Sequence, residues 1–129
     1  MDPQPIERRG RRGPGPRLAL AGAMHGERVV AASGEALATI KDILVDAGRG
    51  RIAYAVLGVG GFMGRGERLI AVPWNALQLD AARNRFVLLA EPSALERAPD
   101  FDQQSLPAYA DLAWHSALHA HWRVRPYWD

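Results

Sequence analysis

The chain has 129 residues, 48% of them hydrophobic, and a formal net charge of +2, which suits one folded domain with tails. It contains no cysteine, which excludes disulfides, a thiolate nucleophile and zinc–thiolate sites. Four serines and one threonine are its only aliphatic hydroxyl residues, so serine-type catalysis has few candidates. No stretch approaches the roughly 20 apolar residues of a membrane span, and no export signal is evident. We therefore expect a soluble, cytoplasmic protein.

The positive charge is concentrated at the N-terminus. Residues 1–28 hold six arginines against three carboxylates, whereas the rest of the chain is close to neutral. Residues 1–22 are rich in proline, glycine and arginine with little to bury, which predicts a disordered tail. The alternative is an electrostatic arm for phosphates, and a ribosome- or RNA-associated factor stays open as a second function. The tail lacks the interleaved aromatic residues that would stack on bases.

Short strands with tight turns are predicted from Met24 onward. The first is Arg28–Ala32, and a longer strand runs from Leu37 to Asp46. Its apolar alternation slips by one residue, which predicts a bulge near Lys41 and Asp42. After a glycine-containing hairpin turn, residues 51–59 form an apolar run, which suits a strand that is covered on both sides.

A glycine-rich turn separates this run from the next strand, Arg68–Val72, which Pro73 ends because it has no N–H to donate. Two further strands are predicted, around Leu79 and over Phe86–Leu89, followed by a helical turn over Pro92–Arg97. Five or six short strands with one short helix predict a mainly β fold, a small barrel or sandwich. Residues 103–129 differ in kind: apolar residues at helical spacing precede an aromatic end, so this helical extension is expected to pack on the barrel or on a second subunit.

Several motifs in this order and spacing resemble the PRC-barrel family: Ile40-Lys41-Asp42, Gly50-Arg51-Ile52-Ala53-Tyr54, Gly60-Gly61-Phe62-Met63-Gly64, Ala71-Val72-Pro73-Trp74 and the terminal Pro126-Tyr127-Trp128 of stand-alone bacterial members. The resemblance implies a closed β-barrel of five to six strands over residues 23–102, similar in fold to the cytoplasmic domain of the reaction-centre H subunit and to the C-terminal domain of the ribosome maturation factor. It also implies a non-catalytic protein–protein docking or adaptor module. The family pattern supplies no catalytic, cofactor or metal residue. The expected partners are a second copy, as a homodimer, and another protein.

The candidate interaction surface consists of large apolar and aromatic residues near turns and in the extension. Phe62 and Met63 at the glycine turn either fold back into the core or mark a contact surface. Tryptophans are more often core or interface anchors than cofactor contacts. The full candidate surface is Phe62, Met63, Trp74, Trp114, Trp122, Tyr127 and Trp128.

Two groups of titratable residues suggest a third class of function, a hydrolase or metal-dependent enzyme. Asp42 and Asp46 are four apart on a strand and face the same way, but turn hydrogen bonds and pairing with Arg49 or Arg51 explain them more simply. His115 and His119 lie one helical turn apart, as in zinc sites. His121 falls on another face of the helix. We expect no catalytic, cofactor or metal site.

Overall fold

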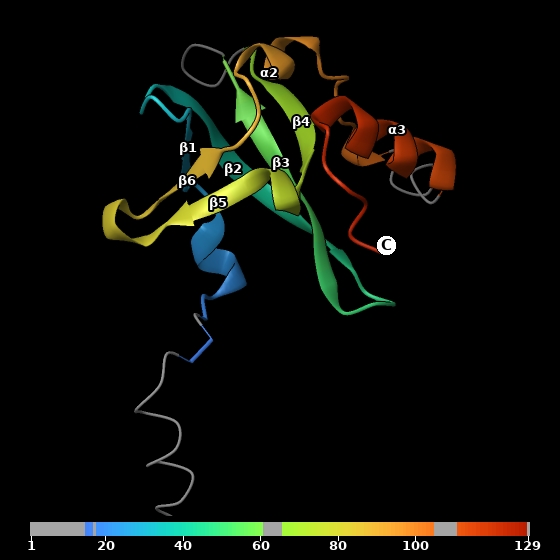
Figure 1. Ribbon diagram of the computed structural model, residues 1–129, viewed down its shortest axis with the longest axis horizontal. Coiled ribbons are helices and arrows are strands. Elements are labelled where there is room, and N and C mark those ends of the chain that lie inside the picture. The colour runs from blue at the N-terminus through green and yellow to red at the C-terminus, as the bar shows by residue number, and fades with distance from the viewer. Residues whose placement is uncertain (1–14, 17, 61–65, 105–110, 129) are drawn as a thin grey trace, which may run out of the picture.

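The computed structural model describes residues 15–16, 18–60, 66–104 and 111–128, which form a mainly β structure with a helix packed beside the sheet (Figure 1). The strands are β1 (Arg28–Val30), β2 (Ala36–Asp46), β3 (Arg51–Val59), β4 (Arg68–Pro73), β5 (Leu77–Asp80) and β6 (Arg85–Leu88). The helices are η1 (Ala21–Met24), η2 (Trp74–Ala76), η3 (Ala81–Arg83), α2 (Ser93–Arg97) and α3 (Leu112–Trp122). The prediction of short strands followed by a C-terminal helix is therefore confirmed.

The six strands form one curled sheet in the order β4-β3-β2-β1-β6-β5. Neighbours pair antiparallel except β1 and β6, which are parallel. Strands β4 and β5 follow each other along the chain but stand at the two ends of this order. Pro73 ends β4, and the single turn of η2 carries the chain to the far edge. Within the described residues the sheet is thus a curled half-barrel, and the closed barrel expected from the sequence is not confirmed.

Two bulges bend the β2–β3 hairpin. Ile40 pairs with Leu57 and Asp42 with Val56, so Lys41 is the extra residue, as the slipped alternation predicted. A second irregularity separates the pairs Leu44–Tyr54 and Val45–Ile52, which leaves Ala53 as the extra residue on β3. No sequence pattern indicated this second bulge, because an alanine inside an apolar run does not interrupt any periodicity. A bulge increases local twist, and this one lies at the end of the hairpin that carries Asp46.

Strand β3 is the centre of the core. Residues 53–58 are all buried, which confirms the prediction that this run is covered on both sides. On β3 and its neighbours, Tyr54, Leu57, Ile40 and Ile70 are almost fully inaccessible. Helix α3 adds Leu118 and Trp122 to the same cluster. Since these two residues are four apart, they project from one face of the helix toward the sheet.

Local chemistry sets the ends of α3. The Asp111 carboxylate accepts a hydrogen bond from the Ala113 N–H at 3.0 Å and caps the first turn. At the other end Arg123 adopts the left-handed conformation, with φ of 58°. Its backbone N–H donates to carbonyl oxygens of the last turn, those of Ala120 and His119. Such a residue ends a helix, although glycine usually fills the position. The chain then turns back toward the β2–β3 hairpin (Figure 1), where Tyr127 bonds Asp46 and Arg51.

Arg68 ties β4 to the segment after α2. Its Nε donates to Asp100 Oδ1 at 2.8 Å, and its Nη2 donates to the Ala98 carbonyl at 2.6 Å. The Phe101 N–H also donates to the Leu69 carbonyl at 2.7 Å. This segment therefore occupies hydrogen-bonding groups at the outer side of β4, which is how proteins protect a terminal strand.

Candidate functional site

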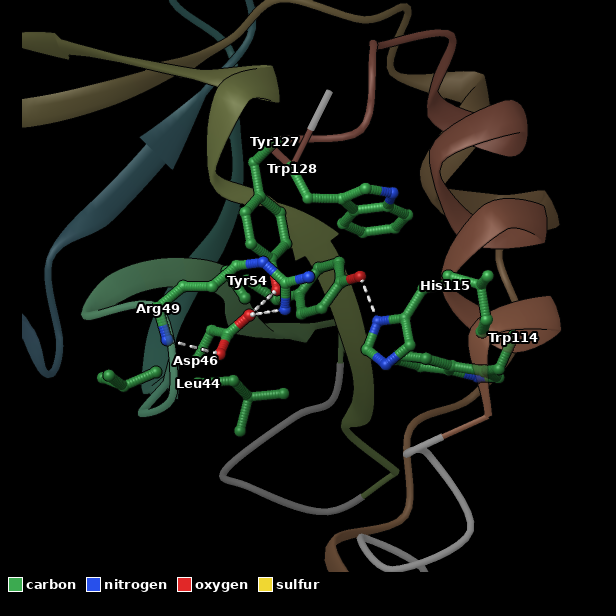
Figure 2. A pocket seen from close by; sticks show the side chains of 11 residues that line it. Leu44, Asp46, Arg49, Tyr54, Trp114, His115, Tyr127 and Trp128 are labelled. Carbon is green, nitrogen blue, oxygen red and sulfur yellow. Dashed lines mark hydrogen bonds and ion pairs between the residues drawn. The ribbon is translucent and has the colours of Figure 1, made fainter.

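A cavity of about 550 Å³ lies between the end of the β2–β3 hairpin, helix α3 and the C-terminal segment. Aliphatic and aromatic side chains make up most of its wall, and one carboxylate, one guanidinium and one imidazole contribute polar groups (Figure 2). The lining residues are Leu44, Val45, Asp46, Arg49, Ala53, Tyr54, Leu112, Trp114, His115, Tyr127 and Trp128. Its size and mixed lining are typical of binding sites.

Tyr54 lies at the centre of this wall. Its hydroxyl is 2.5 Å from His115 Nδ1, and its ring meets Trp114 edge-on with centroids 5.5 Å apart. Only 2% of Tyr54 is exposed, and this burial raises the pKa of its hydroxyl far above the usual value. The hydroxyl therefore keeps its proton, and it holds the imidazole of α3 against β3.

A second hydrogen-bond group closes the hairpin side of the cavity. The Tyr127 hydroxyl donates to Asp46 Oδ2 at 2.6 Å, and Arg49 donates to the same carboxylate from its backbone N–H at 3.1 Å and from Nη1 at 3.2 Å. The bond from Tyr127 holds the pKa of Asp46 below its ordinary value. Burial, with the bond to Asp46, raises the pKa of Tyr127 to about 12. The pair thus exists as carboxylate and neutral phenol near neutral pH.

Arg51 fixes the backbone of this same C-terminal segment. Its Nη1 donates to the Tyr127 carbonyl at 2.7 Å, and its guanidinium lies 5.6 Å from the centre of the Tyr127 ring. Trp128, the next residue, packs edge-on against His119 with centroids 5.1 Å apart. The C-terminal wall of the cavity is therefore held at both of its aromatic residues.

Two of the residues that line the cavity are exposed aliphatic side chains, and together they are called its apolar mouth here. Val45 on β2 is 60% exposed and Leu112 at the start of α3 is 62% exposed. Both line the cavity, although they belong to segments far apart in the sequence. Single exposed aliphatic side chains are common on protein surfaces and need no explanation. Two of them beside an aromatic cavity indicate a contact surface.

The structure places the residues of the predicted interaction surface in different parts of the molecule. Trp114, Tyr127 and Trp128 line the cavity together. Trp74 lies elsewhere and packs on Phe86 with ring centroids 5.5 Å apart. Trp122 is only 2% exposed, so as a core residue it does not belong to an accessible surface in this chain. Phe62 and Met63 lie outside the described residues.

The aspartates and histidines do not assemble a metal centre in the part of the chain that the structure describes. Asp42 is exposed and accepts a hydrogen bond from the Ile43 N–H, while Asp46 pairs with Arg49, as the simpler explanation predicted. His115 and His119 do share a helix face, and both contact Tyr54. His121 points elsewhere, with its Nε2 3.0 Å from the Ala94 carbonyl oxygen.

Sequence reasoning missed Tyr54, Leu44, Val45 and Leu112 as parts of the site. Tyr54 and Leu44 read as ordinary strand residues, because their role depends on a helix some 60 residues further on. Val45 carried a usable signal, since it is an aliphatic residue close to a hairpin turn, and Leu112 carried one as the first residue of a helix.

The comparisons with known proteins agree with the fold. A family model, PRC-barrel domain, matches residues 23–95, which is more than half of the chain. No curated protein matches the sequence. Among the described residues, none of the helices has the length and apolar character needed to cross a membrane.

Proposed function

Because the chain belongs to the PRC-barrel domain family, we propose that it is a non-catalytic docking module that binds another protein at the cavity between the β2–β3 hairpin and α3. Domains of this family often serve in interaction modules. The observation that carries the proposal is the combination at this site: an aromatic cavity with exposed Val45 and Leu112 at its mouth. Interface hot spots have this character, with a pocket that takes an anchor side chain and an apolar surround that excludes water.

The polar groups at the cavity support binding rather than catalysis. Asp46 is occupied by Tyr127 and Arg49, and the Tyr54 hydroxyl is occupied by His115. These bonds join the hairpin to α3 and to the C-terminal segment, so they serve the fold. A general base or nucleophile must instead be within hydrogen-bond reach of its substrate.

Self-association is part of the same proposal. A second copy is one candidate partner for the apolar mouth, since small domains commonly form homodimers through self-complementary patches. Light scattering after gel filtration measures this directly. If the protein is a dimer and the double variant Val45→Ser/Leu112→Ser is a monomer, the second copy binds at this mouth.

The alternative function, binding to RNA, rests on the arginines before residue 18, which lie outside the described residues.

The test of docking compares matched surface variants in extracts of the source cell. The double variant Val45→Ser/Leu112→Ser removes the apolar mouth, and Leu89→Ser changes a residue of similar exposure, 59%, that does not line this cavity. All three positions are exposed, so both proteins should keep the wild-type melting temperature. We expect cross-linked partners to be lost from the double variant and kept by Leu89→Ser. Retention of every partner by the double variant would show that the docking site lies elsewhere.

A further inference from the structure

We propose that the N-terminal arm, defined as residues 18–24, attaches the protein to the surface of an anionic lipid bilayer. The leucines of the arm enter the apolar layer of the bilayer, and the arginines that precede them in the sequence contact the lipid phosphates. None of the residues that line the cavity takes part in this attachment. The cavity therefore stays free for a partner protein while the arm holds the domain at the membrane.

The arm is apolar and almost wholly exposed. Leu18 is 89% exposed and Leu20 is 80% exposed, more than any other large hydrophobic residue that the structure describes. Residues 18–23 are all exposed, and no residue of η1 is buried. An unbroken run of exposed apolar residues is unusual on a folded domain, and it indicates a surface that contacts something else.

The body of the protein leaves the arm uncovered. The arm is fixed at its base, where the Gly26 N–H donates to the Ile40 carbonyl at 2.7 Å, and Met24 is its first partly buried residue. Before that point the described chain, blue in Figure 1, extends away from the sheet. The Ala23 N–H donates to the Leu20 carbonyl at 3.0 Å, so the single turn of η1 is bonded within itself. The two leucines are therefore available to a surface outside the molecule.

The charge next to the arm is positive and unopposed in the sequence. No carboxylate occurs between residues 8 and 26, and the arginines before the leucines are Arg8, Arg9, Arg11, Arg12 and Arg17. Basic residues are attracted to the negative surface of a membrane that contains anionic lipids, and apolar residues add burial in the acyl layer. One such signal gives only marginal attachment, whereas two together give stable attachment. The segment carries both.

The two features together favour a bilayer over partners that use only one of them. RNA is held by phosphate contacts and by stacking on aromatic rings, and the leucines would stay in water beside it. A protein groove that takes a helix binds apolar residues at helical spacing, but Leu18 and Leu20 are two apart and precede η1. A bilayer covers both leucines without requiring a regular helix. The arm is far shorter than the roughly 20 residues of a membrane span, so it lies at the membrane surface.

The experiment is co-sedimentation of the full chain with sucrose-loaded vesicles. One set is pure phosphatidylcholine, which is neutral, and the other mixes phosphatidylcholine with the anionic lipid phosphatidylglycerol. We expect binding to the mixed vesicles, and binding at least about tenfold weaker to the neutral ones, because these lack the charge that attracts the arginines. Raising the salt from about 0.1 M to about 1 M shortens the Debye length from about 10 Å to about 3 Å, and should weaken binding to the mixed vesicles.

Two matched double variants separate the arm from exposed leucines in general. Leu18→Ser/Leu20→Ser should bind the mixed vesicles at least about tenfold more weakly than wild type, because both leucines lose their burial in the acyl layer. Leu79→Ser/Leu89→Ser changes two leucines outside the arm, 43% and 59% exposed, and should bind like wild type. All four positions are exposed, so both proteins should keep the wild-type melting temperature.

Three outcomes overturn the proposal. If wild type and Leu18→Ser/Leu20→Ser bind the mixed vesicles equally, the arginines act alone, as they would on RNA. If wild type binds a single-stranded RNA more tightly than the mixed vesicles at the same salt, the segment serves nucleic acid. If wild type fails to bind the mixed vesicles, the arm has another partner. Light scattering then shows whether that partner is a second copy, as a dimer that the leucine variant converts to monomer.

Discussion

The attachment of α3 to the half-barrel is tested by Leu118→Ala, with Leu112→Ala as its matched control on the same helix. Leu118 is 4% exposed and belongs to the core cluster, whereas Leu112 is 62% exposed. Truncation at Leu118 removes three buried carbon groups, worth about 2.4 kcal/mol at about 0.8 kcal/mol each. The cavity left behind adds to this loss. We expect the free energy of unfolding to fall by about 2 to 4 kcal/mol, and by less than about 0.5 kcal/mol for Leu112→Ala.

Urea unfolding, followed by two spectroscopic probes, measures this loss in the free energy of unfolding. Tryptophan fluorescence reports mainly on the C-terminal part, because Trp114, Trp122 and Trp128 lie there and only Trp74, in η2, lies outside it. Far-ultraviolet circular dichroism reports on the whole backbone. If α3 belongs to the cooperative core, both probes give one coincident transition that shifts in Leu118→Ala with an unchanged slope. A fluorescence transition at lower urea than the dichroism transition, or a loss equal to that of Leu112→Ala, would refute the packing argument.

Three further outcomes follow from single side chains. Arg123→Gly should stabilise by about 1 kcal/mol in thermal unfolding, because glycine adopts φ of 58° without strain. Arg68→Ala should destabilise by about 1 to 2 kcal/mol in urea, and Arg68→Lys should not restore the loss, because lysine cannot reproduce the fork that reaches Asp100 and the Ala98 carbonyl. The hydrogen bond from Tyr127 lowers the pKa of Asp46 from its ordinary value of 3.8, so ionised Asp46 stabilises the fold at any pH above 3.8. This contribution is lost as the pH falls through the lowered pKa. The melting temperatures of wild type and Tyr127→Phe, measured from pH 7 to pH 3, should therefore converge in acid.

The strands could be predicted from the sequence where a local pattern encodes them. The prediction of a strand over residues 51–59 is confirmed by β3, and its ends could be found because a glycine stands next to each of them in the sequence. The bulge at Lys41 was visible as a slip in a period of two. Barrel closure was not predictable in the same way, since it depends on whether β4 and β5 meet around the curl. That geometry is set by the accumulated twist of six strands, which leaves no mark on any one of them.

The site was predicted only in part, and the reason is the distance in sequence between its halves. Aromatic residues in the extension marked Trp114, Tyr127 and Trp128 as anchors, but composition alone could not separate them from Trp122, which the same helix turns into the core. The bonds of Tyr54 to His115 and of Asp46 to Tyr127 join residues 61 and 81 positions apart. Pairs of this kind follow from the tertiary fold and carry no local periodicity.

Since the same contacts attach the extension and build the cavity, binding and stability are linked in a measurable way. A ligand that binds only the folded chain adds RT ln(1 + [L]/Kd) to the free energy of unfolding, which is about 1.4 kcal/mol at ten times Kd. While Leu118→Ala remains almost entirely folded, its affinity for a partner protein bound at the cavity should equal that of wild type, because apparent affinity falls only with the competent fraction. Near the unfolding midpoint the bound partner should restore much of the lost stability. A weaker affinity at temperatures where the variant is fully folded would show instead that Leu118 shapes the cavity directly.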